Sequence, residues 1–410
     1  MQTKNADPAV VIIGGGPAGS FSAYELAKRG VNVDVFEEHL QIGFPSHCAG
    51  HISIRSLRSL GLYPLPGGIV ENEFSAANFY SPNGTKFSVH LNQPVTCAVN
   101  RAQFDSYLAE KAQTARATYH LGTRVQSLRV DGGFVRGVSV AKGSSVRQVS
   151  AKLVIDAEGV SSRFVRQAGL KPLRRDGLVF AVEAEVDRVQ DVEDHAVEVY
   201  VGQDYAPGFY AWLIPRLDGT AKVGLATNEG NPKVFLERFM HNHPVASKQL
   251  KNAKVTQMAF HAITLGGPIG KAYANGFLAV GDAASQVKAT TGGGVVFSVT
   301  CAKIAAQVAK EALVRDDFSE GFLQLYQKLC SDRLGFDASV MRRARRMVDS
   351  LSDAQFNRAM HFGTRIGLGK ALSDVNEIDF QGRTLFTVLK KPAAYAALAY
   401  FIRLYLSANA

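Results

Sequence analysis

Residues 10–19 read VVIIGGGPAG, a β-branched run that enters a glycine-rich turn without a break. Val10–Ile13 predicts a short buried strand, and the segment after the turn predicts a helix. The spacing is that of a dinucleotide-binding GxGxxG turn, in which Gly14 permits the tight turn and Gly16 lets the backbone approach a pyrophosphate. Gly19 would let the helix pack closely on the strand. The stretch therefore predicts an α/β fold with phosphate bound at a helix N-terminus.

An acidic residue follows the turn at the distance that a dinucleotide requires. The second predicted strand, Val31–Phe36, ends at Glu37, about 20 residues past the glycines, where a carboxylate bonds the adenosine ribose. A glycine-rich turn in an unrelated α/β protein gives no reason for an acid at this position. The nucleotide contacts expected from this segment are Gly14, Gly16, Ala18, Gly19, Glu37 and Glu38.

Composition restricts the class of protein. The chain has 410 residues, 46% hydrophobic and 20% charged, which suits a soluble protein with two interleaved domains. We expect a cytoplasmic protein, because the N-terminal apolar run is too short for a secretion signal and no run reaches the ~18 apolar residues of a membrane span. Four scattered cysteines predict neither a disulfide scaffold nor a metal site. The net charge of +10 favours an anionic membrane face or a phosphorylated substrate, but nothing indicates a nucleic-acid-binding module.

Three further motifs accompany the first turn. Asn100-Arg101 begins a predicted helix that extends to Ala115, VIDAEGVSSR occupies residues 154–163, and GFLAVGDAA occupies residues 276–284. In this order they resemble the p-hydroxybenzoate-hydroxylase-like flavoproteins, with their DG and GD motifs. The resemblance implies that the dinucleotide is FAD and that Asp282 bonds the ribityl chain. It adds as expected FAD contacts Arg101, Val125, Asp156, Gly159 and Asp282.

The nucleotide signature is split by strand-rich blocks, which is typical of a large flavoprotein. We expect a Rossmann-like FAD-binding domain interrupted by a mixed-sheet substrate domain and followed by a helical C-terminal region. The expected boundaries are 1–70, 100–178 and 262–320 for the FAD-binding domain, 71–99 and 179–261 for the substrate domain, and 321–410 for the helical region.

A second glycine run, Gly292-Gly293-Gly294, precedes Val295 and opens another predicted helix. In a flavoprotein, its bare backbone amides would face N1 and O2 of the isoalloxazine and stabilise the negative charge of reduced flavin. A close helix crossing that requires small residues is the alternative interpretation.

Two other stretches narrow the resemblance. FPSHCAG occupies residues 44–50, and PGFYAWLIP occupies residues 207–215. They resemble the archaeal geranylgeranyl reductases, whose P-x-x-Y-x-W-x-F-P signature is matched except that Ile214 replaces the phenylalanine. The resemblance implies reduction of geranylgeranyl double bonds in membrane-lipid precursors such as 2,3-di-O-geranylgeranylglyceryl phosphate, by hydride from flavin N5 and a proton. It covers the chain well to about residue 310.

The expected catalytic residues are Cys48, Tyr210 and Trp212. Tyr210, Trp212 and Ile214 alternate, so they share one strand face, which lines either the prenyl tunnel or an ordinary sheet core. The loop containing Cys48, Ala49 and Gly50 should approach the flavin. The proton donor stays open among Cys48, Tyr210 and His47, and Cys48 is either reactive or inert packing. Cys301 is a conceivable redox partner of Cys48, whereas His51 and His261 are expected to be structural.

Other functions stay open. The substrate could be geranylgeranyl diphosphate or a chlorophyll precursor; the protein could instead be an oxygen-dependent FAD monooxygenase or halogenase, or a prenyl-binding chaperone without flavin. The electron donor is NADPH or ferredoxin. Apolar residues recur at helical spacing near the C-terminus, beside basic residues, which predicts either a helix on the inner membrane face or a core-docking helix. They are Tyr395, Leu398, Ile402 and Tyr405, with Lys390, Lys391 and Arg403 nearby.

Overall fold

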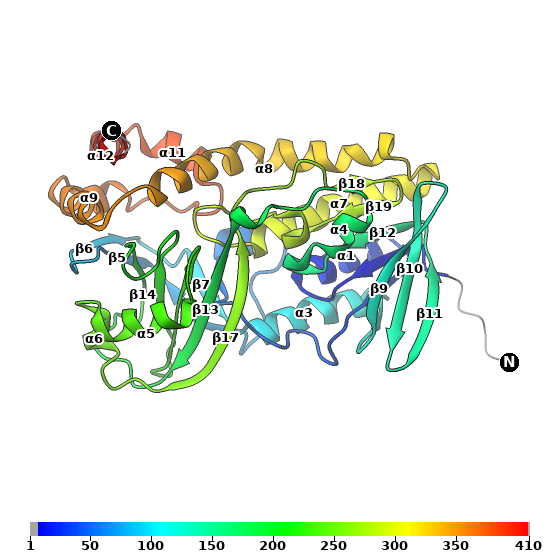
Figure 1. Cartoon of the computed structure of the whole chain (residues 1–410), viewed down its shortest axis with the longest axis horizontal. Coiled ribbons are helices and arrows are strands. Elements are labelled where there is room, and N and C mark those ends of the chain that lie inside the picture. The colour runs from blue at the N-terminus through cyan, green and yellow to red at the C-terminus, as the bar shows by residue number, and fades with distance from the viewer. Residues whose placement is uncertain (1–6, 409–410) are drawn as a thin grey trace. The chain divides into compact units, whose positions relative to one another are not determined.

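The computed structural model describes residues 7–408 and divides into two compact units, many of whose elements are labelled in Figure 1. Unit 1 is formed by the chain up to Pro45, by Ala102–Gly177 and by Thr264–Phe336. Unit 2 is formed by Ser46–Arg101, by Leu178–Ile263 and by the chain from Asp337 onward. The chain therefore passes between the units several times, as the split motifs predict.

Unit 1 is built on a six-stranded sheet of order β18-β19-β12-β1-β2-β8. The central strands pair in parallel, with β1 (Val10–Ile13) between β12 (Leu153–Asp156) and β2 (Val33–Phe36). The outer strands are β8 (Thr118–His120), β19 (Phe277–Ala279) and the antiparallel β18 (Tyr273–Ala274). Both β1 and β12 are buried at every residue, which is typical of a parallel sheet covered on both faces.

The other elements of unit 1 are helices and a small antiparallel sheet. They are α1 (Pro17–Ala27), α4 (Arg163–Gln167), α7 (Val295–Arg315), the 3₁₀ turns η1 (Gly159–Ser161), η2 (Arg175–Gly177) and η3 (Gly281–Ala284), and β9 (Arg124–Asp131), β10 (Phe134–Lys142) and β11 (Ser145–Ser150). Helix α3 (Arg101–Thr114) begins at the last residue of a unit 2 segment and continues in unit 1. Helix α8 (Glu320–Asp349) runs from unit 1 into unit 2.

Unit 2 contains a seven-stranded mixed sheet of order β17-β13-β16-β15-β14-β5-β6. Its strands are β5 (Ala76–Tyr80), β6 (Lys86–His90), β13 (Leu178–Val186), β14 (Ala196–Tyr200), β15 (Ala211–Pro215), β16 (Ala221–Thr227) and β17 (Val255–Thr264). A second sheet has the order β3-β7-β4, with β3 (His51–Ser53), β4 (Val70–Phe74) and β7 (Thr96–Val99).

Side chains from alternate positions of these strands enter different clusters. Leu213 and Val223 belong to a core that includes Phe239 of α5 (Pro232–Asn242) and residues of α6 (Ala246–Gln249). Ile214 belongs to another cluster, with Phe74 of β4 and Ala98 of β7. The two faces of β15 therefore pack against different elements.

The C-terminal helices belong to unit 2. They are α9 (Asp353–Arg365), α10 (Leu368–Ala371), α11 (Gln381–Val388) and α12 (Pro392–Ala408), with α2 (Ile54–Ser59) from an earlier segment. Leu404 of α12 packs with Leu351 and Phe356, so the helix docks by one side as the core interpretation predicts. Among the described helices, none alone meets the length and apolarity of a membrane span, although α11 and α12 together do, with a bend of 116° between them.

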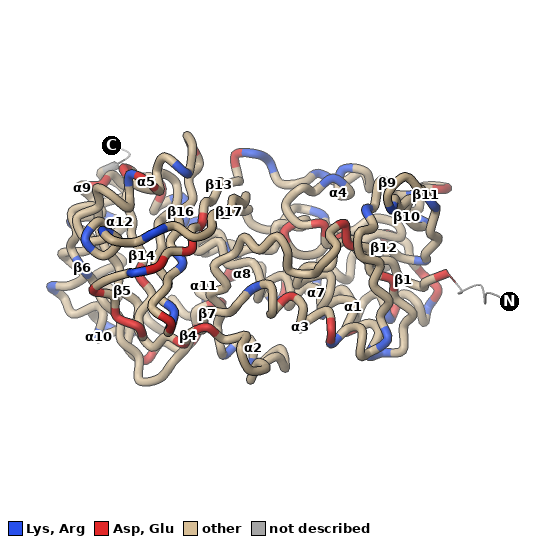
Figure 2. The backbone as a smooth tube through the Cα atoms, turned by 90° about the horizontal axis from the view of Figure 1, so that it is seen from below, with Lys and Arg blue, Asp and Glu red and all other residues tan. Residues whose placement is uncertain are grey.

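The expected fold class is confirmed, but the compact units have different boundaries from the expected domains. Residues 46–70 lie in unit 2, because β3 pairs with β7, and residues from Asp337 onward join unit 2 instead of forming a separate region. Helix α1 begins at Pro17, because proline fits the first position of a helix. Lys and Arg occur along both units (Figure 2).

The core beneath the unit 2 sheet supplies a test of stability. Replacing Phe239, which is 0% exposed, by alanine should lower the free energy of unfolding by about 3–5 kcal/mol, through lost burial and a cavity. Phe239→Ala would be compared with Val234→Ala on the same helix, where the side chain is 51% exposed and the expected loss is under about 1 kcal/mol. Chemical denaturation measures both, and equal losses would contradict this packing.

Candidate functional site

The first glycine turn has the shape that a dinucleotide phosphate requires. Gly14 has φ of +93°, and a Cβ there would lie 2.5 Å from the Ala157 oxygen. A Cβ on Gly19 would lie 1.9 Å from the Gly14 oxygen, so α1 approaches the turn more closely than any side chain permits. In contrast, a Cβ on Gly16 would meet no atom within 4 Å. The N-terminus of α1 therefore opens onto free space at Gly16, where a phosphate could accept its N–H groups.

The acid after β2 lies against this turn. Glu37 Oε2 accepts a hydrogen bond from the Gly15 N–H at 2.7 Å, and its Oε1 accepts one from the His39 N–H at 2.9 Å. The carboxylate is thus held at the side of the turn, where the sequence predicts the ribose contact. Neighbouring Glu38 is half-exposed and forms an ion pair with Arg124 at 3.2 Å.

The other predicted contacts of unit 1 lie at the ends of β9 and β12. Val125 is buried, and its carbonyl accepts a hydrogen bond from Arg163 at 2.6 Å. Asp156 pairs with Ile13 across the sheet, and its Oδ1 accepts a hydrogen bond from the Glu158 N–H at 3.0 Å. Its buried Oδ2 has no hydrogen-bond partner among the described residues. Burial, followed by the charge of Glu158, raises the pKa of Asp156 well above its usual value.

The second glycine run, residues 292–294, precedes α7, whose first turn lies close to the first turn of α1. Gly281 has φ of +68°, and a Cβ there would lie 3.0 Å from Cβ of Ala18 and 3.4 Å from Oγ of Ser298. These residues belong to the first turns of α1 and α7, so both helices begin beside η3. A Cβ on Gly294 would lie 3.1 Å from Asp282 Oδ1. The prediction that the triple glycine precedes a helix is confirmed, since α7 begins at Val295.

These residues of unit 1 fit the cofactor that the sequence implies. Two helices present their positive N-terminal ends around Asp282, and one of these ends opens onto free space at Gly16. The remaining expected contacts are in the same unit, at turns without a bulky side chain. They are Gly159 of η1 and Gly292 and Gly293 before α7. The roles of individual residues at the cofactor remain predictions.

The predicted flavin-facing loop of unit 2 is held at several points. The Ala49 carbonyl accepts a hydrogen bond from Lys222 at 3.2 Å, and the Gly50 carbonyl accepts one from the Val99 N–H at 3.0 Å. A Cβ on Gly50 would lie 3.2 Å from Cγ of Arg101. Cys48, immediately before these two anchored residues, has a partly exposed side chain.

Two histidines stack beside this loop. The rings of His47 and His261 have centroids 4.2 Å apart. Burial, followed by the charges of His47 and Arg101, lowers the pKa of His261 to about 3, so His261 is neutral at neutral pH. His51 lies 2.7 Å from the Thr96 hydroxyl, which suits the structural role that the sequence predicts. Cys301, the conceivable partner of Cys48, is instead buried beside Cys330, with which it shares a hydrogen bond.

The aromatic pair before and within β15 lies on one side of the sheet, as alternation predicts. The rings of Tyr210 and Trp212 are 6.0 Å apart, and Trp212 packs in the cluster that contains Ile214 and Ala49. Ile214 is 4% exposed and belongs to the sheet core, whereas Tyr210 and Trp212 remain partly exposed. Burial raises the pKa of Tyr210, which keeps its hydroxyl protonated.

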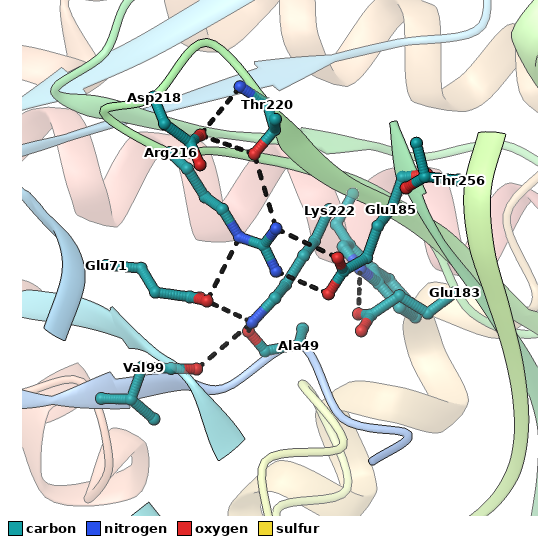
Figure 3. A network of polar contacts seen from close by, with 11 residues as sticks. Ala49, Glu71, Val99, Glu183, Glu185, Arg216, Asp218, Thr220, Lys222 and Thr256 are labelled. Carbon is teal, nitrogen blue, oxygen red and sulfur yellow. Dashed lines mark hydrogen bonds and ion pairs between the residues drawn. The ribbon is translucent and has the colours of Figure 1, made fainter. Parts of the chain in front are cut away.

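The structure adds an ion cluster that the sequence analysis does not name (Figure 3). Lys222 is 4% exposed, and its Nζ donates to the Val99 and Ala49 carbonyls and to Glu71 Oε2 at 2.7 Å. Arg216 forms ion pairs with Glu71 at 3.3 Å and with Glu185 at 2.6 Å. The signal in the sequence was Lys222 as the only charged residue of the strand Ala221–Thr227, because a buried lysine requires several acceptors.

Alanine substitutions at Gly16 and Gly19 distinguish an effect on cofactor binding from an effect on stability. Gly16→Ala should leave apoprotein stability within about 0.5 kcal/mol of wild type, since its Cβ meets no protein atom. The methyl group would nevertheless occupy the space needed by a phosphate, so FAD affinity should fall at least tenfold. Gly19→Ala should lower the stability of the apoprotein itself. Thermal unfolding and flavin titration check both, and unchanged affinity in Gly16→Ala would contradict this site.

Comparison with known proteins places these features in a family. Residues 7–328 match the family model described as FAD binding domain. The chain is 34% identical to digeranylgeranylglycerophospholipid reductase 2 of Methanopyrus kandleri, over 85% of this chain and 88% of that protein. It is 31% identical to digeranylgeranylglycerophospholipid reductase of Methanocaldococcus jannaschii, over 98% and 99%.

A solved structure agrees with these relatives. The crystal structure of a geranylgeranyl bacteriochlorophyll reductase-like protein from Thermoplasma acidophilum matches with a TM-score of 0.85 and 26% identity, over 96% of this chain and 99% of that one. The family match includes every unit 1 residue expected to bind the cofactor, from Gly14 to Val295. The chain therefore belongs to the FAD binding domain family and, within it, to the digeranylgeranylglycerophospholipid reductases, and it is an FAD-dependent oxidoreductase.

Proposed function

We propose that this protein uses FAD to saturate the double bonds of geranylgeranyl chains in a lipid precursor such as 2,3-di-O-geranylgeranylglyceryl phosphate. The observation that carries the proposal is the partly exposed pair Tyr210 and Trp212, in which Trp212 packs against the apolar side chains of Phe74 and Ile214. Relatives that match nearly the whole chain are named for the reduction of such lipids. Aromatic rings of this kind bind hydrocarbon without supplying charge.

The chemistry requires a dry site with one proton source. An isolated alkene gains a hydride at one carbon and a proton at the other, and bound FAD in its reduced form supplies the hydride. Tyr210 and Trp212 would hold the chain and exclude water. Cys48 and Tyr210 are the proton donors that we propose. Tyr210 has a protonated hydroxyl at neutral pH, although burial raises its pKa and so makes it a weaker acid. Cys48 is on the loop fixed through Ala49.

Each chemical group of FAD would contact a different part of the chain. The N-terminus of α1 at Gly16 would bind the pyrophosphate, Glu37 the ribose and Asp282 the ribityl chain. The N-terminus of α7 at Gly294 would stabilise the negative charge of reduced flavin, because helix N-termini carry a partial positive charge. The loop containing Cys48 and Gly50, with Arg101, would complete the contacts.

Two other substrates are candidates, because free geranylgeranyl diphosphate and a chlorophyll precursor have the same isoprenoid chain. An oxygen-dependent monooxygenase or halogenase would use the same cofactor motifs, but relatives that match nearly the whole chain are named as reductases. The electron donor that we propose is NADPH or ferredoxin. The net charge of +10 suits an acidic protein donor as well as a phosphorylated lipid.

Turnover without oxygen decides between these activities. The purified flavoprotein, reduced with dithionite under anaerobic conditions, should convert 2,3-di-O-geranylgeranylglyceryl phosphate into products that gain one pair of hydrogens after another, as measured by mass spectrometry. Geranylgeranyl diphosphate tested in parallel shows the preferred substrate, and unreduced protein is the control. If no geranylgeranyl compound gains mass, the proposed activity is wrong; product that requires oxygen would indicate a monooxygenase.

We also propose that the protein contacts the membrane surface through α12. Tyr395, Ile402 and Leu406 are 66%, 40% and 62% exposed, and their spacing of seven and four residues places them on one side of the helix. Lys390 and Arg403 are exposed nearby. An apolar helix side flanked by cations binds anionic lipid surfaces, from which a prenyl lipid could be taken.

Vesicle binding tests this surface. Replacing Tyr395, Ile402 and Leu406 together by serine should lower the share of protein that sediments with anionic vesicles at least fivefold, because each change removes an apolar group from the lipid contact. Serine at Phe260, which is 56% exposed on β17, is the control and should leave sedimentation unchanged. Equal sedimentation of wild type and the triple variant would exclude α12 as the contact.

A further inference from the structure

The indole of Trp212 reaches across a strand to a carboxyl group. Trp212 on β15 lies opposite Gly224 on β16, and Gly224 in turn lies opposite Glu183 on β13. Trp212 Nε1 donates a hydrogen bond to Glu183 Oε2 at 3.2 Å. A Cβ on Gly224 would lie 2.5 Å from Cζ2 of the indole, so the ring occupies the space that a side chain would fill. The glycine therefore permits the contact between Trp212 and Glu183.

Two cations lie near Glu183, but both form their ion pairs with other carboxylates. Arg216 binds Glu185 through two hydrogen bonds, at 2.6 and 3.2 Å, and Lys222 binds Glu71 at 2.7 Å (Figure 3). Within the described part of the chain, the only hydrogen bond or ion pair of the Glu183 carboxyl is the one from Trp212. Two cations thus neutralise two carboxylates, and the third carboxyl has an uncharged partner.

The burial of Glu183 brings the loss of its proton into the neutral pH range. Burial raises the pKa of Glu183 to about 7, although the charge of Lys222 and the hydrogen bond from Trp212 oppose this rise. Glu185 on the same strand raises this pKa, and Arg216 after β15 lowers it. On the other side of β13, strand β17 carries one titratable residue, His261, whose pKa of about 3 keeps it neutral in this range.

We propose that Glu183 is a positioning residue for the lipid: it orients the Trp212 indole, and its uncharged form keeps the surface around that ring suited to a prenyl chain. The lipid part of this inference rests on the proposed function. An ionised carboxylate beside hydrocarbon loses hydration without gaining a cation, so ionisation and lipid binding oppose each other. Lipid affinity should therefore fall as pH rises through the range in which Glu183 loses its proton.

The first experiment uses the only tryptophan of the chain. Incorporating 5-fluorotryptophan into the FAD-bound protein gives one fluorine resonance to follow by NMR as pH changes. In the wild type, this resonance should shift with a midpoint near 7. In Glu183→Gln, whose amide oxygen still accepts the indole N–H, that transition should disappear. If the Glu183→Gln resonance titrates as in the wild type, the proposal is wrong.

The second experiment measures lipid binding through steady-state kinetics. The KM of the wild type for the geranylgeranyl lipid should rise by up to about tenfold per pH unit above 7, with kcat little changed, because binding is lost equally in the ground and transition states. In Glu183→Gln, KM should be constant over the same range. A constant KM in the wild type would overturn the role in lipid binding.

Two further variants test the proposal independently of Glu183→Gln. Glu185→Gln, on the same strand, should retain the rise in KM with a lower midpoint, since the charge of Glu185 raises the pKa of Glu183. Trp212→Phe removes the indole N–H that lowers this pKa, so the midpoint of KM should move upward. If Glu183→Gln does not fold, an unchanged midpoint in Trp212→Phe overturns the proposal. The fluorine titration needs no lipid, so it tests the role of Glu183 even if the wild type shows no turnover. Absence of turnover would refute the proposed function without deciding the titration.

Discussion

The absence of a side chain at Gly281 is the constraint on which unit 1 depends. At this position the backbone lies against Ala18 and Ser298, so the first turns of α1 and α7 meet beside Asp282. A Cβ there would lie in tight contact with both residues, and the φ of +68° is one that residues with side chains rarely adopt. Each helix adds unpaired N–H groups and a partial positive charge to the same edge of the parallel sheet. An anionic group at this edge would therefore meet two helix N-termini.

In unit 2, a buried charged side chain holds distant segments of the chain together. Lys222 is nearly inaccessible, and a lysine in that position is tolerated only when each of its donors is satisfied. Its partners are Glu71 and the carbonyls of Ala49 and Val99, so one ammonium group links the large sheet to the small sheet and to the loop after Cys48. The position of that loop thus depends on a residue more than 170 positions later, as the separation of Ala49 and Lys222 shows.

The comparison of Glu37 with Glu183 explains which site residues the sequence could reveal. Glu37 follows a strand and a glycine turn at a fixed spacing, so local geometry is enough to place its carboxylate beside Gly15. Glu183 is 29 residues from Trp212, and their contact depends on the pairing of β13, β16 and β15 in one register. Alternating polar and apolar residues predict strands but not which strands are neighbours. The same reason explains the shifted unit boundaries, because the pairing of β3 with β7 is also non-local.

The sequence by itself determined the glycine turns, the helices that follow them, the FAD family and the shared face of Tyr210 and Trp212. The turns, the helices and the shared face follow from spacing over a few residues, where backbone sterics leave few choices. The FAD family follows from the order of several motifs along the chain. Only the tertiary structure decided that α1 and α7 begin together, that Ile214 belongs to the core, that Lys222 bonds the loop after Cys48 and that Glu183 bonds the Trp212 indole. Those contacts join distant segments, and their energies depend on burial and on the pairing of charges that no local pattern records.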